Sequence, residues 1–188
     1  SFINLTEGNV GDVSKILSSL NVSGNNIEEN KLYLEKQYAV YLDKAFSDKK
    51  LKLQKDRDFT ELMENILNPS VTDFEVPDEI QVELRPYQVT GYKWLRTLAG
   101  NRLGGILADD MGLGKTLQSI VYIASILKER KADNGPKPHF LVVCPTSLAY
   151  NWLDEIENYA PFIKAAVVNG IPQERKELVD RYRDYDVL

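Results

Sequence analysis

The sequence has 188 residues, a formal net charge of −5 and a single cysteine. A chain of this length can bury about 70% of its unfolded surface, one cysteine excludes an internal disulfide, and the acidic balance argues against coating nucleic acid by bulk charge. No apolar run approaches the ~20 residues of a membrane span. The first residues also lack the basic-then-apolar layout of a signal peptide, so we expect a soluble, cytoplasmic protein with no membrane partner.

Residues 1–78 predict a small, mostly helical accessory module. Three stripes of apolar residues recur there at helical spacing, namely Val13, Ile16, Leu17 and Leu20, then Tyr38, Tyr41, Leu42, Ala45 and Phe46, then Phe59, Leu62, Met63, Ile66 and Leu67. Asp12 is the expected cap of the first helix, and residues 2–5 alternate as in a short strand. We interpret the stripes as inward helix faces, with a partner groove as the alternative. The lysines within residues 49–55 fit a solvated loop, with contacts to DNA phosphates as the alternative.

Residues 79–188 predict an α/β domain with a parallel sheet, after a polar linker over residues 70–77. Apolar runs bounded by turn residues predict strands at 105–108, 140–144, 165–168 and 185–188. The run at 140–144 is continuous, which is typical of a strand buried on both faces. Helical spacing predicts helices from Pro86, after Lys115, after Pro145 and over 173–183. Thr146 or Ser147 is the expected cap of the third of these helices.

The segment from Ile106 to Thr116 carries the clearest chemistry. Its apolar run leads into Gly112, Gly114, Lys115 and Thr116, and a helical pattern follows. Glycines let successive backbone N–H groups turn toward an anion, a lysine brings an ammonium to the β- and γ-phosphates, and a threonine hydroxyl can bind the accompanying Mg²⁺. The usual phosphate loop has glycine where this chain has Asp109. We predict an ATP–Mg²⁺ site, with a plain glycine-rich turn as the alternative.

Gln88 is the candidate for recognising the base. It lies in the helix predicted from Pro86, 27 positions before Lys115, and its amide offers the donor and acceptor that pair with the edge of adenine. The alternative is a solvated polar residue on a helix. His139 has no histidine or cysteine companion and predicts no metal role, and Cys144 is expected to be a small buried apolar residue. No nucleophile–base pair supports a hydrolase of the Ser-His-Asp type.

Three motifs in this order resemble those of the Swi/Snf-type, helicase-like ATPases. The first is Leu84-Arg85-Pro86-Tyr87-Gln88-x-x-Gly91-x-x-Trp94-Leu95. The second runs from Ile106 to Gln118 and contains Asp109-Asp110-Met111-Gly112-Leu113-Gly114-Lys115-Thr116, with Asp110 where that family mostly has glutamate. The third is Cys144-Pro145-Thr146-Ser147-Leu148-x-x-Asn151-Trp152-x-x-Glu155. The segment before residue 78 is similar, more weakly, to the helicase-associated region of bacterial members.

The resemblance implies the first part of a RecA-like lobe that binds ATP and Mg²⁺ at the edge of a parallel sheet. Lys115 and Thr116 would be the catalytic residues, with Thr116 on the metal. The nucleotide would contact Tyr87, Gln88, Asp110, Met111, Gly112, Leu113, Gly114, Lys115, Thr116 and Leu117. The backbone of Pro145, Thr146 and Ser147 would touch one strand of duplex DNA without reading its sequence. The family uses ATP hydrolysis to move along double-stranded DNA and to displace or reposition bound proteins.

Hydrolysis in this family also needs a strand that ends in Asp-Glu, and a second lobe. Asp78-Glu79 and Asp154-Glu155 do not end an apolar strand. We therefore expect a fragment that binds nucleotide weakly and does not turn over ATP alone. Two alternatives stay open, an RNA helicase of the DEAD-box kind and a nucleotide-gated, non-enzymatic scaffold.

Overall fold

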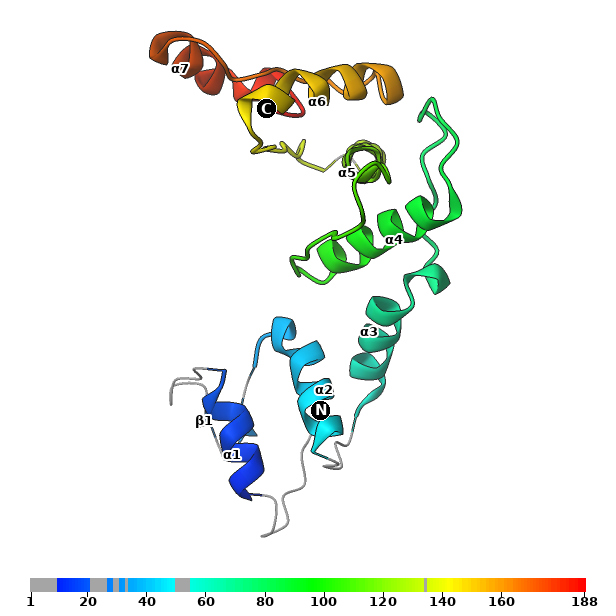
Figure 1. Ribbon diagram of the computed structural model, residues 1–188, viewed down its shortest axis with the longest axis vertical. Helices are drawn as coiled ribbons and strands as arrows, with labels where there is room; N and C mark the ends of the chain where they lie inside the picture. Colours follow the sequence, from blue (N-terminus) through cyan, green and yellow to red (C-terminus); the bar gives the residue numbers. More distant parts are fainter. Residues whose placement is uncertain (1–9, 21–26, 29–30, 33, 50–54, 134) are drawn as a thin grey trace. The chain divides into compact units, whose positions relative to one another are not determined.

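The computed structural model describes residues 10–20, 27–28, 31–32, 34–49, 55–133 and 135–188 (Figure 1). The chain divides into two compact units, one of Ser1–Val71 with Thr97–Gly104 and one of Thr72–Arg96 with Gly105–Leu188. The strand predicted at residues 2–5 lies outside the described residues, as do Lys50 and Lys52 of the lysine-rich segment. Of the helices that the structure describes, none is both long and apolar enough to cross a membrane.

The first unit is helical, as its apolar stripes predict. Its elements are α1 (Val10–Ser18), the two-residue antiparallel strands β1 (Ile27–Glu28) and β2 (Lys31–Leu32), η3 (Lys36–Tyr38), α2 (Ala39–Asp48), α3 (Arg57–Leu67) and η4 (Pro69–Val71). Val13 and Ile16 of α1 pack with Phe46 of α2, and Leu17, Leu42 and Ala45 lie against this cluster. The first two stripes therefore meet each other, which confirms their interpretation as inward faces.

The ends of these helices differ in part from expectation. Asp12 lies inside the first turn of α1, which begins earlier at Val10, so the predicted cap is wrong. At a different helix, α3, Asp56 is the cap, because its carboxylate accepts a hydrogen bond from the backbone N–H of Phe59 at 2.8 Å. The lysines at the two ends of the lysine-rich segment pair with carboxylates, Lys49 with Asp12 and Lys55 with Asp43.

The second unit is organised around α5 (Lys115–Ala132). The residues of α5 that are buried are Leu117, Gln118, Ile120, Val121, Ile123, Ala124 and Ser125. Leu117 and Val121 pack with Tyr92 of α4 (Pro86–Gly100). On another side of α5, a second apolar cluster contains residues of this helix and of the following segments. Its buried members are Ile120, Ile123, Ala124, Ile156, Ala160, Ile163 and Val187. Helix α5 therefore contributes to two apolar clusters at once.

Three short segments near the end of the chain run parallel to one another. Val187 forms isolated parallel bridges with Phe140 and with Ala165. The N–H of Phe140 donates to the carbonyl of Asp186 at 2.8 Å, and the N–H of Ala166 donates to the carbonyl of Val187 at 3.1 Å. Three of the predicted strands thus lie beside each other in the predicted direction. Among the described residues, these bridges do not extend into a parallel ladder of several residues. The full parallel sheet stays a prediction.

Two expectations for the apolar runs are wrong in the described part of the chain. Residues 105–108 form no strand, and the side chain of Ile106 is 86% exposed. In the run at 140–144, Phe140 and Val142 pack on the core, whereas Leu141 is 74% and Val143 is 86% exposed. A strand needs a hydrogen-bonded neighbour, and burial on both faces needs a cover on each. No described segment supplies these to residues 105–108 or to the outer face of 140–144.

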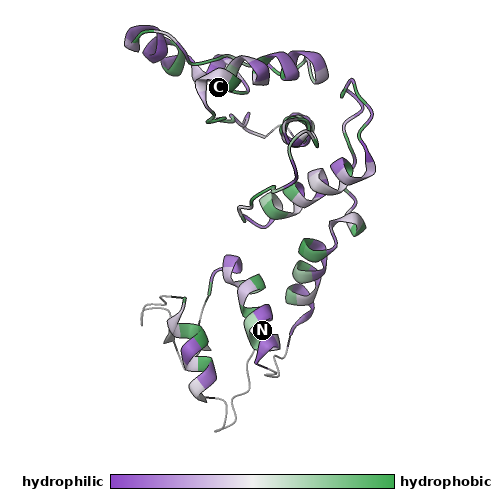
Figure 2. Ribbon diagram, viewed as in Figure 1, coloured by the Kyte–Doolittle hydropathy of each residue, from purple (hydrophilic) through white to green (hydrophobic). Residues whose placement is uncertain are grey.

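The remaining helices are α6 (Thr146–Tyr159), which packs on α5, and α7 (Pro172–Asp180), which is followed by η5 (Tyr182–Asp184). Helix α7 carries no buried residue, and its ribbon is coloured mostly as hydrophilic in Figure 2. A charged helix is therefore confirmed in the predicted range 173–183, and the last part of that range forms a 3-10 turn.

Truncating the core side of α5 tests this arrangement. Ile120 is 0% exposed, and we expect Ile120→Ala to lower the free energy of unfolding by about 2–5 kcal/mol, because it leaves a cavity. The matched control is Ile171→Ala, which removes the same atoms at a position that is 60% exposed and should change little. Denaturant unfolding measures the free energy of unfolding of both variants. Equal losses of stability would contradict the conclusion that the core of the unit forms around α5.

Candidate functional site

The loop of residues 109–114 leads directly into α5. Gly112 has φ 83° and Gly114 has φ 76°, both in the left-handed region that favours glycine. Gly114 is the residue that precedes the helix, and the first intrahelical bond runs from the N–H of Gln118 to its carbonyl at 3.0 Å. The first N–H groups of α5 therefore have no carbonyl partner within the helix and carry its positive end. The predicted glycine turn at a helix start is confirmed.

The ammonium of Lys115 lies against this loop. Its Nζ donates to the carbonyl of Asp109 at 2.7 Å and to the carbonyl of Asp110 at 2.8 Å. Thr116 is half-buried in the first turn of α5, next to Lys115. A cation, a hydroxyl and backbone N–H groups without a partner inside the helix are thus gathered at one helix start, which is a suitable set of groups for binding an anion with several oxygens.

Gln88 lies beside the loop and is 7% exposed, so its interpretation as a solvated residue is wrong. Its Nε2 donates to the carbonyl of Leu113 at 3.2 Å, and its Oε1 accepts from the backbone N–H of Arg85 at 2.9 Å. Both ends of the amide are engaged by the backbone, one of them at the loop itself. Tyr87, the neighbouring candidate, is 37% exposed.

Sequence reasoning missed a second glutamine at this site. Gln118 is 0% exposed, and its Nε2 donates to a carboxylate oxygen of Asp109 at 3.1 Å. Its Oε1 is buried and has no partner among the described residues. A Cβ at Gly91 of α4 would overlap this oxygen, and a Cβ at Gly114 would overlap the amide nitrogen of Gln88. The available signal was a glycine inside one helical pattern and a glutamine on the buried side of another.

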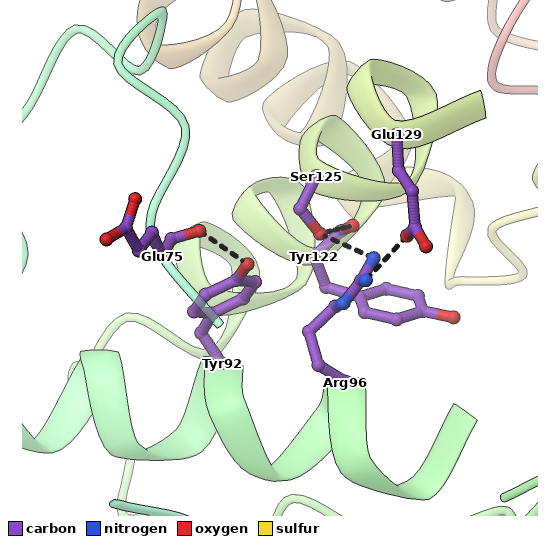
Figure 3. A network of polar contacts seen from close by, with 6 residues as sticks. All are labelled: Glu75, Tyr92, Arg96, Tyr122, Ser125 and Glu129. Atoms are coloured by element: carbon purple, nitrogen blue, oxygen red, sulfur yellow. Dashed lines mark hydrogen bonds and ion pairs between the residues drawn. The ribbon is translucent and has the colours of Figure 1, made fainter. Parts of the chain in front are cut away.

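A network of polar contacts fixes α4 on α5 within the second unit (Figure 3). The guanidinium of Arg96 donates to the hydroxyl of Ser125 at 3.3 Å and to the carboxylate of Glu129 at 2.6 Å. It also lies 4.7 Å from the ring centroid of Phe74. The hydroxyl of Tyr92 donates to the carbonyl of Glu75 at 2.8 Å. The Arg96 bonds to Ser125 and Glu129 hold the helix that carries Gln88 against the helix that follows the loop, whereas the contacts with Glu75 and Phe74 join α4 to the segment before it.

The predicted DNA-contacting residues lie at the start of α6. Pro145, Thr146 and Ser147 are all exposed there. Pro145 occupies the cap position, and no side chain caps the helix, so the predicted cap at Thr146 or Ser147 is wrong, since both residues already belong to the helix. In the described part of the chain, no backbone hydrogen bond joins these three residues to the loop at 109–114.

A cavity of about 270 Å³ opens beside the start of α6. It is lined by residues 141–144, by Trp152 and by residues 165–169. Cys144 is half-buried in this lining rather than fully buried. His139 accepts or donates a hydrogen bond with the carbonyl of Tyr185 at 2.8 Å through Nδ1.

Two family models match this chain. The SNF2-related domain matches residues 87–188, and the bacterial SNF2 helicase-associated domain matches residues 1–77. The chain is 41% identical over 143 residues to the TATA-binding protein-associated factor mot1 of Schizosaccharomyces pombe, which covers 72% of this chain and 7% of that protein. It is 42% identical over 117 residues to the ISWI chromatin-remodeling complex ATPase ISW1 of Saccharomyces cerevisiae, which covers 61% of this chain and 10% of that protein.

Among solved structures, the chain is similar to the Sulfolobus solfataricus SWI2/SNF2 ATPase core in complex with dsDNA. The TM-score is 0.49 at 35% identity, with 61% of this chain and 23% of that chain covered. The chain spans a tenth or less of the length of mot1 and of ISW1.

Alanine substitutions at the two loop glycines distinguish the stability cost of backbone strain from that of side-chain overlap. We expect Gly112→Ala to lower the free energy of unfolding by about 1–2 kcal/mol, because its φ is left-handed while no atom lies within 4 Å of the new Cβ. Gly114→Ala should cost more, because its Cβ also displaces the amide of Gln88. Gly104→Ala, with an ordinary φ and open space, is the control in denaturant unfolding. Equal losses at Gly112 and Gly114 would contradict the contact with Gln88.

Glu155 on α6 gives a prediction for pH. Burial raises the pKa of this carboxyl above its ordinary value, so folding is penalised wherever Glu155 is charged, and the penalty vanishes below the unfolded pKa. Glu155→Gln should therefore stabilise the chain at pH 7, and the gain should disappear below about pH 4. The control is Glu157→Gln, at an exposed position of the same helix. A gain that persists unchanged at low pH in denaturant unfolding would contradict this cause.

Proposed function

Because the chain belongs to the SNF2-related domain family, we propose that it forms the ATP-binding part of a DNA-dependent ATPase that moves along double-stranded DNA and remodels protein–DNA complexes. The observation that carries this proposal is the loop at 109–114. Two glycines in the left-handed region, the free start of α5 and the Lys115 ammonium converge there. In this proposal, residues 79–188 are part of a RecA-like lobe and residues 1–78 are a helical accessory module.

The phosphates of ATP would lie over the loop. The backbone N–H groups of Asp110, Met111, Gly112, Leu113 and Gly114 and of the first turn through Leu117 would donate to the phosphate oxygens. Lys115 would exchange the carbonyls of Asp109 and Asp110 for the terminal phosphates, which are the stronger, charged acceptors. Tyr87 and Gln88 would lie on the adenine side, and the Gln88 amide would exchange its backbone partners at Leu113 and Arg85 for the edge of the base.

The residues present also fit Mg²⁺ in its usual role with ATP. The described residues contain no group of three His, Cys, Asp or Glu side chains that could hold a metal ion by themselves. An ion bound by the hydroxyl of Thr116, water and phosphate oxygens needs no such group. When bound, Mg²⁺ neutralises charge on the transferring phosphate. The Thr116 hydroxyl and the Lys115 ammonium would orient and stabilise that phosphate, which makes them the catalytic residues of this proposal.

The start of α6 would contact DNA. Pro145, Thr146 and Ser147 are exposed, and the helix that begins there has no side-chain cap. Its free N–H groups can donate to phosphates of one DNA strand. Such contacts fix the position of the duplex without reading its sequence. The partners of the full-length protein would then be double-stranded DNA and a DNA-bound protein that is displaced or moved.

A lysine substitution tests the ATP site. Lys115→Ala in this chain should weaken binding of ATP–Mg²⁺ by about tenfold or more, because the charged contact to the phosphates is lost. Lys176→Ala removes the same group from the exposed surface of α7 and should leave binding unchanged. Calorimetry or a fluorescent ATP analogue measures both. Equal affinity of Lys115→Ala and the parent would overturn the proposed site.

A second experiment, on ATP hydrolysis by the full-length protein, tests the rest of the proposal. Duplex DNA should stimulate its ATP hydrolysis, and Lys115→Ala should abolish the stimulated rate. Stimulation by RNA and not by duplex DNA would instead favour an RNA helicase. ATP binding without hydrolysis under any nucleic acid would favour a nucleotide-gated scaffold.

A further inference from the structure

Two glutamine–glycine pairs cross between α4 and the start of α5. Gln88 of α4 lies against Gly114, and Gln118 of α5 lies against Gly91 of α4. Each glutamine amide fills the space that a side chain at the glycine would take. Each also reaches the loop, Gln88 at the carbonyl of Leu113 and Gln118 at the carboxylate of Asp109. The loop is therefore held near both of its ends by buried amides from two helices.

We propose that Gln118 is a positioning residue of the ATP site, an inference that rests on the function proposed above. Gln118 would not touch the nucleotide. It fixes Asp109, and the carbonyl of Asp109 is one of the two acceptors of the Lys115 ammonium. A displaced Asp109 would displace the resting place of Lys115 and change the shape of the loop that follows.

The chemistry of Gln118 argues against a role in packing alone. Its side chain is 0% exposed, and its Oε1 is buried with no partner among the described residues. A buried polar atom without a hydrogen bond lowers stability, and an apolar side chain of similar volume avoids that loss. Stability alone would therefore favour leucine at this position. What leucine cannot supply is the bond from Nε2 to Asp109.

The middle of the loop is exposed, in contrast to its two ends, which are held by buried amides. Asp110, Met111 and Gly112 are exposed, and no atom lies within 4 Å of a Cβ placed on Gly112. A loop that is fixed at its ends and open in its middle keeps its donors accessible while limiting the shapes they can adopt. Such preorganisation strengthens binding by reducing the conformational entropy lost when the ligand arrives.

The experiment compares Gln118→Leu with the matched control Gln173→Leu, which lies on exposed α7. In the nucleotide-free chain, we expect Gln118→Leu to speed hydrogen exchange of the Leu113 amide, which donates to the carbonyl of Asp110 at 3.5 Å, by about threefold or more. ATP–Mg²⁺ affinity should fall by about three- to tenfold, in line with the net contribution of one ordinary hydrogen bond. Thermal stability should be equal to or above that of the parent, which a merely structural glutamine would not allow. Unchanged exchange and affinity would overturn the proposal.

A second variant keeps the test available if Gln118→Leu does not fold. Asp109→Ala removes the same bond from its half-buried end, and it should give the same change in exchange and affinity. The double variant should be no worse than either single one, because both act through one bond. Additive losses would overturn the proposal. If the parent chain does not bind ATP at all, the proposed function fails, and the role of Gln118 is then decided by loop exchange alone.

Discussion

The second unit depends on the burial of α5 by two apolar clusters. Residues on one part of its surface pack with Tyr92 of α4, and residues on another pack with Ile156 of α6 and with Val187. A helix held in this way cannot shift without opening both clusters, because protein interiors are close-packed and resist small displacements. The loop at 109–114 ends where this helix begins, so its last residues take their position from the core.

The contacts between α4 and α5 differ in what they contribute. The packing of Tyr92 with Leu117 and Val121 contributes to stability, because it removes apolar surface from water. The Arg96 guanidinium contributes less to stability, because its Nε is buried without a partner among the described residues, and Glu129 is half-exposed. Its geometry, set between Ser125, Glu129 and the ring of Phe74, instead defines where along α5 the helix α4 can lie. That register places Gln88 at the loop.

Local chemistry explains what the sequence predicted well. The glycine turn before α5, the meeting stripes of α1 and α2, and the parallel direction of the segments at Phe140, Ala165 and Val187 all follow from patterns within a few turns of chain. The motif order also predicted the family that the comparisons show. The pattern that predicts each of these features can be read from nearby residues, even where the feature itself joins segments far apart in the chain.

The features that sequence reasoning missed depend on partners elsewhere in the chain. Leu141 and Val143 have the composition of a buried strand, but burial is decided by what covers them. Asp12 and Thr146 have suitable cap side chains, yet each helix had already begun at or before them. Gln118 is an ordinary residue of a helical pattern until Gly91 and Asp109 are placed beside it.

The crossed glutamine–glycine pairs also restrict how this sequence can evolve. A side chain at Gly91 meets the amide of Gln118, and a side chain at Gly114 meets that of Gln88. Neither glycine can therefore be replaced first without a clash. Shortening Gln118 opens room for a side chain at Gly91, whereas Gly114 stays strained by its left-handed φ even when Gln88 is shortened. At the first pair, Gln118 should accordingly change before Gly91 in evolution, and at the second pair Gly114 should stay glycine.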